Sequence, residues 1–129
     1  MKKLFITAIS AAAILAGAAA ANLSVTGVAQ ADALAINLCT YVEGNDRLRM
    51  RQRLREDRVQ LRRVYESIGC NGMTLLQFAM HTGSDDIGEF IVSQLPGSVI
   101  ETTGDLEWAE GNGHGSGTVA QAIRERIGS

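Results

Sequence analysis

Residues 70–83 read CNGMTLLQFAMHTG, and this stretch indicates the fold class. It opens on a turn signal, and Thr74 and Gln77 follow with the spacing of a capping box, in which each side chain bonds the other residue's backbone amide at a helix start. Gly83 suits the left-handed residue that ends many helices. The stretch therefore predicts a short helix over residues 75–82.

A second helix is predicted directly after it, up to the Pro96-Gly97 stop. Ser84 is suited to cap its start, and two acidic residues follow where the helix dipole favours them. Gly88 and Ala79 are small enough to let the two helices approach closely. The buried face of the second helix has four apolar residues at helical spacing: Ile87, Phe90, Ile91 and Leu95.

Two further helices are predicted upstream. The first covers residues 33–43, with Asp32 as its cap. The second is long: it begins after Asn45 or Asp46 as cap and ends at Gly69. Its apolar residues fall in a narrow arc at 100° per residue: Met50, Leu54, Leu61, Tyr65 and Ile68.

Residues 1–31 have the layout of a cleavable secretory leader: two lysines, an uncharged run and then small residues. Cleavage after Ala21 and cleavage after Ala31 both fit the small-x-small rule, and Asp32 at the mature start favours the second. A membrane anchor is disfavoured because Ala and Gly dominate the end of the run. We expect a periplasmic or secreted protein with no transmembrane anchor after cleavage.

Cleavage changes the charge of the chain, because both lysines leave with the leader. Ten arginines and fourteen acidic residues remain, a formal charge of −4. Nucleic-acid-binding domains normally carry a basic footprint, so nucleic acid is not an expected partner. No cofactor-binding motif is present either.

Cys39 and Cys70 both remain after cleavage, and exported proteins favour disulfides. A bridge between them closes a loop of about 32 residues and stabilises the fold by up to ~3.7 kcal/mol on the chain-entropy model. The alternatives are a reactive thiol or a metal site that adds His81 and His114, but the spacing matches no known metal pattern. His81 suits the dipole of a last helical turn, and we expect His114 to be solvated.

The predicted long helix carries eight arginines and two acidic residues between positions 47 and 63, a local charge of +6. Guanidinium groups bind phosphate through paired hydrogen bonds, so anions such as lipopolysaccharide or lipid headgroups are candidate ligands. Alternatively, the seven acidic residues between positions 85 and 110 pair with the arginines internally, or water solvates them. Five arginines form the candidate anion-binding stripe: Arg47, Arg51, Arg55, Arg58 and Arg62.

Residues 97–129 differ in composition from the rest, being acidic and then rich in glycine over 111–117. We expect a loosely ordered tail, with a weak hairpin of residues 99–103 and 106–109 and a last helical turn or two after Thr118. The complete prediction is an all-α protein. It has a leader, a disulfide-linked bundle of about four helices over residues 32–96, and this tail.

Residues 71–95 resemble the helix pair of an ankyrin repeat, but no second copy follows. A broader resemblance links the chain to DUF3718, a family of small exported bacterial proteins of unknown function. It spans residues 32–95 and rests on the features Leu38-Cys39, the basic helix, Cys70-Asn71-Gly72, Phe78-Ala79 and Gly83. It implies residence in the envelope of Gram-negative bacteria and no assigned activity.

No catalytic motif appears in the sequence. The favoured interpretation is a non-enzymatic interaction module with an envelope protein as partner. An anionic-surface binder that uses the arginine-rich helix over 47–63 is the first alternative, and a small enzyme is the second.

Overall fold

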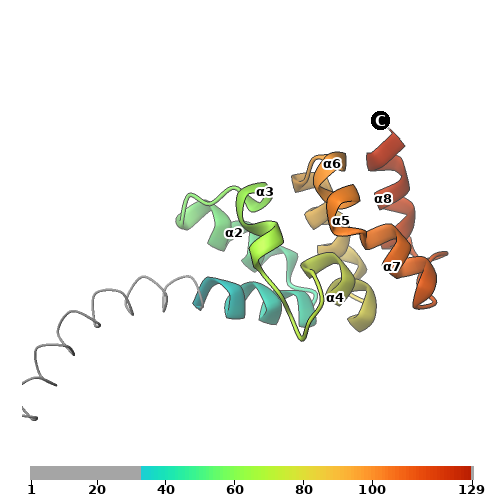
Figure 1. Ribbon diagram of the computed structural model, residues 1–129. Helices are drawn as coiled ribbons and strands as arrows, with labels where there is room; N and C mark the ends of the chain where they lie inside the picture. The colour runs from blue at the N-terminus through green and yellow to red at the C-terminus, as the bar shows by residue number, and fades with distance from the viewer. Residues whose placement is uncertain (1–32, 129) are drawn as a thin grey trace, which may run out of the picture. The chain divides into compact units, whose positions relative to one another are not determined.

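The computed structural model describes residues 33–128, and the regular elements among them are helical (Figure 1). This confirms the all-α prediction, although about four helices was too low a number. The leader, residues 1–31, and the Asp32 cap lie outside the described residues. Residues 33–43 are helical, and they are followed by α2 (Arg47–Glu56), α3 (Leu61–Val64), the 3₁₀ helix η1 (Tyr65–Ser67), α4 (Leu75–Thr82), α5 (Asp85–Gln94), α6 (Gly97–Thr103), α7 (Asp105–Gly111) and α8 (Thr118–Gly128).

The start of α4 has the predicted capping box. The Gln77 amide donates to Thr74 Oγ1 at 3.1 Å, and the Thr74 amide donates to Gln77 Oε1 at 3.2 Å. Gly83 ends the helix in the left-handed conformation, with φ 71°. The helices on either side of this turn, α4 and α5, pack against each other. Local sequence alone therefore specifies this helix pair.

The single long helix predicted after Asp46 was wrong. α2 ends at Glu56, and Arg58 adopts a left-handed backbone with φ 54°. The Val59 amide then bonds the Leu54 carbonyl at 2.9 Å and closes the helix end. Helical structure resumes only at Leu61, as α3 and η1. The break separates the candidate arginines onto two elements and a turn.

The loosely ordered tail and its hairpin were also wrong for the described part of residues 97–129. Pro96 is the N-cap of α6, and Gly104, with φ 68°, separates α6 from α7. α8 is longer than the turn or two expected and packs on both α5 and α6. Five residues of this region are buried hydrophobics that complete the core: Ile100, Ala109, Val119, Ala120 and Ile123.

Gly88 brings α5 close to α8. A Cβ atom built on Gly88 would lie 2.5 Å from Val119 Cγ2 and 3.4 Å from Ala79 Cβ. The predicted approach between Gly88 and Ala79 is therefore present, but the tighter contact is with a helix that the sequence reasoning had assigned to a tail. This contact joins the last helix to the core.

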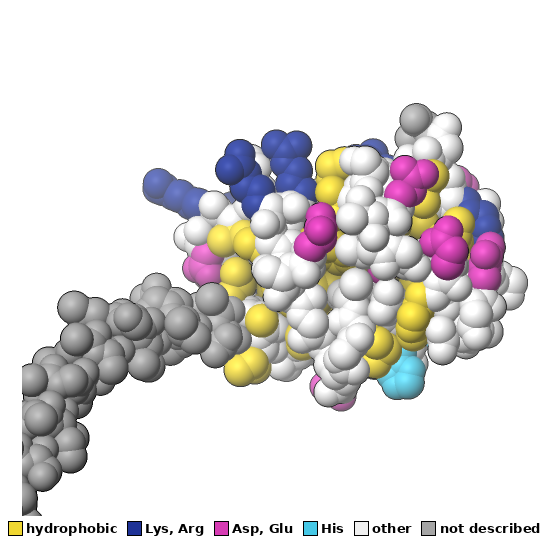
Figure 2. All heavy atoms as spheres, viewed as in Figure 1, with side chains coloured by type: hydrophobic (Ala, Val, Ile, Leu, Met, Phe, Trp, Pro, Cys, Tyr) yellow, Lys and Arg dark blue, Asp and Glu magenta, His cyan; other side chains and the backbone are white. Residues whose placement is uncertain are grey.

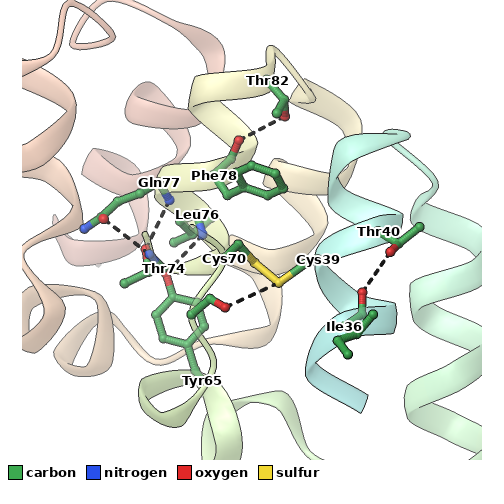
Figure 3. The surroundings of a disulfide bond; sticks show 11 residues. Ile36, Cys39, Thr40, Tyr65, Cys70, Thr74, Leu76, Gln77, Phe78 and Thr82 are labelled. Atoms are coloured by element: carbon green, nitrogen blue, oxygen red, sulfur yellow. Dashed lines mark hydrogen bonds between the residues drawn. A yellow bond between two sulfur atoms is a disulfide. The ribbon is translucent and has the colours of Figure 1, made fainter. Parts of the chain in front are cut away.

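The Cys39 and Cys70 sulfur atoms lie 2.05 Å apart, at disulfide distance, and the two Cα atoms are separated by 5.7 Å (Figure 3). The bridge connects the helix over residues 33–43 to the turn before α4. Asn71, with φ 54°, and Gly72, with φ 80°, form that turn. No helix among residues 33–128 has the length and apolar character needed to cross a membrane.

Candidate anion-binding site

The candidate arginines lie on a surface formed by α2, the turn after it and α3. Figure 2 shows dark-blue side chains gathered in this region, at the upper left of the view. Arg47, Arg51 and Arg55 follow one another at four-residue spacing along one side of α2 and are exposed. Arg58 lies in the turn, and Arg62 lies in α3. We call these five residues the arginine surface.

The acidic partners of α2 are local. Asp46 Oδ2 lies 3.3 Å from Arg49 Nε, and Asp57 Oδ2 lies 3.0 Å from Arg53 Nε. Within residues 33–128, the five guanidinium groups of the arginine surface make no ion pair or hydrogen bond, either with these acids or with the seven acidic residues between positions 85 and 110. The internal pairing that was the alternative to external binding is therefore not formed in this part of the chain.

A groove of about 310 Å³ runs between α2 and α5 at the middle of the arginine surface. Arg51 and Arg55 line its α2 side, and Phe90 and Gln94 line its α5 side. Leu54 and Val59 provide apolar atoms between the two helices. The described residues that line the groove include no acidic side chain that could neutralise the two arginines.

Asn45 positions the two sides of the groove. Its side-chain oxygen accepts a hydrogen bond from the Ile87 amide at 3.0 Å, in the first turn of α5. Asn45 has φ 54° in the turn that precedes α2, so it caps a helix 42 residues further along the chain. The prediction offered Asn45 or Asp46 as the cap of α2, and Asp46 is that cap. Ser84 makes no side-chain capping bond to α5, and its hydroxyl pairs with that of Thr82 at 2.8 Å.

The arginine surface and the disulfide both fall within the part of the chain that a family model matches. The model describes a protein of unknown function (DUF3718), and it matches residues 38–102, half of the chain. The chain belongs to the DUF3718 family. No curated protein and no solved structure matches it.

One carboxylate next to the matched DUF3718 region is fully buried. Asp105, with 0% exposure, begins α7 and accepts four hydrogen bonds from neutral side chains. Sequence reasoning missed this cluster because three of the donors lie 28 to 40 residues away in the chain. The donors are the Tyr65 hydroxyl at 2.6 Å, the Thr74 hydroxyl at 2.9 Å, the Gln77 side-chain amide at 3.0 Å and the Thr103 hydroxyl at 2.9 Å.

Tyr65 joins Asp105 to the start of α4, and Figure 3 shows its side chain beside Thr74 and Leu76. Its hydroxyl donates to Asp105 and accepts from the Leu76 amide at 3.3 Å. Burial raises the pKa of Tyr65 well above its ordinary value, and the negative charge of Asp105 raises this pKa further. The phenol is therefore a neutral donor that fixes η1, α4 and α7 to one another.

Each of the two histidines stacks on an aromatic side chain. His81 stacks against Phe78, with ring centroids 6.4 Å apart, and His114 stacks against Trp108 at 5.5 Å. His114 was expected to be solvated in a loose glycine stretch, but it is partly buried against the indole. Among the described residues, no group of three or more His, Cys, Asp and Glu side chains has a geometry that holds a metal ion.

A second hollow of about 290 Å³ lies beside the disulfide of the DUF3718 domain. Its lining includes Ile36, Cys39, Cys70 and Phe78. Ile36 is 63% exposed and is one of two large apolar side chains exposed among the described residues, the other being Leu48. This hollow contains no arginine and is separate in its lining from the groove between α2 and α5.

Proposed function

We propose that this protein is an exported binding module that attaches to phosphate-bearing anionic surfaces of the bacterial envelope through the arginine surface. The observation that supports the proposal is the set of five guanidinium groups without ion pairs among residues 33–128, although the domain carries an excess of acidic residues. Guanidinium groups bind phosphate bidentately and are more weakly hydrated than ammonium groups. The exposed guanidinium groups of the arginine surface are therefore available to bind phosphate.

The charge distribution supports an oriented encounter with such a surface. The +6 segment over 47–63 and the acidic segment over 85–110 make opposite local fields in a domain of net negative charge. Such fields steer association over roughly one Debye length, about 10 Å at 0.1 M salt. The domain then approaches an anionic surface with α2 and α3 leading.

We assign the protein no catalytic role. Two titratable side chains within residues 33–128 are buried and hydrogen-bonded, Tyr65 and Asp105, and they bond to each other and to structural neighbours. They line neither of the two hollows described above. A base or nucleophile has to reach a bound substrate in order to act.

Binding to vesicles tests this function. Vesicles that contain phosphatidylglycerol are compared with vesicles of phosphatidylcholine alone, across a salt series from about 0.01 M to about 1 M, which shortens the Debye length from about 30 to about 3 Å. The proposal expects binding to the anionic vesicles, loss of that binding at high salt, and a large loss in the variant Arg51→Gln/Arg55→Gln/Arg58→Gln. Equal binding to both kinds of vesicle, or binding that salt leaves unchanged, would contradict it.

Export is a separate part of the proposal. It rests on the leader pattern of residues 1–31 and on the disulfide-distance pair of cysteines, since such bonds persist in oxidising compartments. N-terminal sequencing of the protein from a periplasmic extract is expected to begin at Asn22 or at Asp32. The intact mass should rise on reduction by the mass of two hydrogen atoms. A chain that keeps Met1 and is found in the cytoplasm would refute export.

A protein partner in the envelope is the second candidate function. The exposed Ile36 beside the hollow at the disulfide favours it, because exposed apolar patches mark interaction sites. Crosslinking in cells is expected to give one defined product that Ile36→Ser abolishes and that the triple arginine variant retains. A product that depends on the arginines instead would assign the contact to the arginine surface.

A further inference from the structure

We propose that the groove between α2 and α5 is a discrete site for a single phosphate monoester, held by Arg51 and Arg55 with the Gln94 amide as a third donor. This inference rests on the proposed function and makes it more specific. It separates two arginines of the arginine surface from the other three. It also predicts that these two act as a site, and not only as part of a diffuse positive charge.

The α5 residues that lie next to each α2 arginine support this distinction between Arg51 and Arg55 and the other three. Arg47, Arg51 and Arg55 are spaced by four residues on α2, and Asp86, Phe90 and Gln94 have the same spacing on α5. Arg47 shares a hollow with the carboxylates of Asp46 and Asp86, so acidic groups lie in its surroundings. Arg51 and Arg55 share the next hollow with Phe90 and Gln94, and its described lining residues carry no carboxylate.

The chemistry of the lining matches a monoester better than a diester. A phosphate monoester carries between one and two negative charges near neutral pH and has three terminal acceptor oxygens. Two guanidinium groups balance that charge, and their N–H groups are donors for its oxygens. Gln94 Nε2 donates one hydrogen to Ser93 Oγ at 3.3 Å, which leaves its second hydrogen as the third donor for the phosphate. A diester has one charge and two terminal oxygens, so it leaves part of this donor set unused.

The apolar residues of the groove indicate what the ester carries. Phe90 is partly exposed in the lining, and Leu54 and Val59 complete the wall between the helices. A volume of about 310 Å³ is at the lower end of the range for small-ligand sites, roughly 300 to 1,000 Å³. The site therefore fits one phosphate with a small ring or chain against Phe90.

The groove is preformed in the domain. The Asn45 side chain joins the turn before α2 to the first turn of α5, and Leu54 is buried between the helices with 6% exposure. Arg51 and Arg55 are exposed, so their guanidinium groups reach a ligand without any rearrangement of the core. Preformed geometry reduces the entropic cost of binding.

The test uses phenyl phosphate as a soluble monoester, with inorganic phosphate for comparison, in calorimetric titrations of the purified protein. Arg51→Gln/Arg55→Gln should weaken phenyl phosphate binding at least about tenfold, as expected when charge-assisted hydrogen bonds are lost. The matched control, Arg47→Gln/Arg62→Gln, removes the same charge outside the groove and should change binding by less than about threefold. Phenyl phosphate should also bind more tightly than inorganic phosphate, and Phe90→Leu should reduce that difference.

Equal weakening by the two double variants would overturn the groove site and leave the proposed function in place. No binding of phenyl phosphate to the unaltered protein, with vesicle binding intact, would also overturn the site alone. Vesicles with phosphatidic acid, a lipid monoester, identify the source of the ligand. Binding to them that depends on Arg51 and Arg55 supports a membrane headgroup. Binding of the soluble ester without binding to these vesicles supports a free phosphate ester as the source of the ligand.

A second measurement guards against misfolding of the variants. In NMR spectra of the unaltered protein, phenyl phosphate should shift the side-chain amide signal of Gln94 and leave that of Gln121 on α8 unchanged. Shifts spread evenly over both amides would contradict a discrete site.

Discussion

The side-chain oxygen of Asn45 accepts the Ile87 backbone amide at 3.0 Å, so a residue in the turn before α2 caps the start of α5. This bond fixes the two helices that form the groove relative to each other. It takes the place of the bond that Ser84, the local N-cap residue, does not make. Together with buried Leu54, this contact between distant parts of the chain sets the register of the candidate site.

Replacing Asn45 should destabilise the domain in a defined order. Asn45→Gly removes the hydrogen bond but tolerates φ 54°, so we expect a loss of about 1 kcal/mol. Asn45→Ala adds left-handed strain of about 1 to 2 kcal/mol. Urea unfolding at equilibrium measures both changes. Alanine at this position that is as stable as glycine would show that the strained turn relaxes.

The buried carboxylate network should be sensitive to the loss of its acceptor. Asp105→Ala leaves four donors without their partner and should cost at least about 3 kcal/mol. Tyr65→Phe removes one donor and should cost about 1 to 3 kcal/mol. Glu107→Ala, in the same first turn of α7 but exposed, is the control and should stay within about 0.5 kcal/mol. Equal effects of Asp105→Ala and Glu107→Ala would mean that the network does not hold the fold together.

Tyr65 also predicts how stability depends on alkaline pH. Its pKa is raised in the folded state, so near its ordinary value of 10.0 the unfolded chain releases the phenolic proton and the folded chain keeps it. This contribution to stability is complete below that value and is lost as pH rises toward the folded pKa. Tyr65→Phe should flatten this part of the stability profile. A profile above pH 10.0 that is identical in both proteins would contradict the assignment.

The contact between α5 and α8 gives a test of the corrected C-terminal region. Gly88→Ala should cost about 1 to 3 kcal/mol, because its Cβ would lie 2.5 Å from Val119 Cγ2, even though alanine is the better helix former. Combined with Val119→Ala, the loss should be smaller than the sum of the single losses. Gly111→Ala, which meets no atom within 4 Å, should be neutral. Additive losses at Gly88 and Val119 would show that the two helices do not meet there.

Some of these features follow from short-range sequence, and others depend on distant contacts. The capping box of Thr74 and Gln77 was predictable because the two residues are three positions apart. The break after α2 was missed because the apolar arc continues through it, whereas the left-handed Arg58 has no signature as strong as glycine. The five arginines of the predicted stripe therefore lie on α2, on the turn after it and on α3, and not on one helix.

The prediction for the C-terminal region was wrong for a different reason. Residues 99–103 are mostly β-branched and favour a strand by local propensity. Ile100 is nevertheless buried in α6, which packs on α7 and α8, so tertiary packing decides the conformation. The sequence likewise did not show that Arg51 and Arg55 line one groove with Phe90 and Gln94, because the groove forms only when α2 and α5 pack together.

The most direct test of the account compares two triple variants on the same phosphatidylglycerol vesicles. Arg51→Gln/Arg55→Gln/Arg58→Gln removes arginines that form no ion pair within residues 33–128. Arg49→Gln/Arg53→Gln/Arg124→Gln removes the same charge from arginines that are already paired with Asp46, Asp57 and Glu110. The account predicts that the first variant loses vesicle binding and the second keeps most of it. Equal losses would contradict the claim that the unpaired arginines of α2 and the following turn form the binding surface.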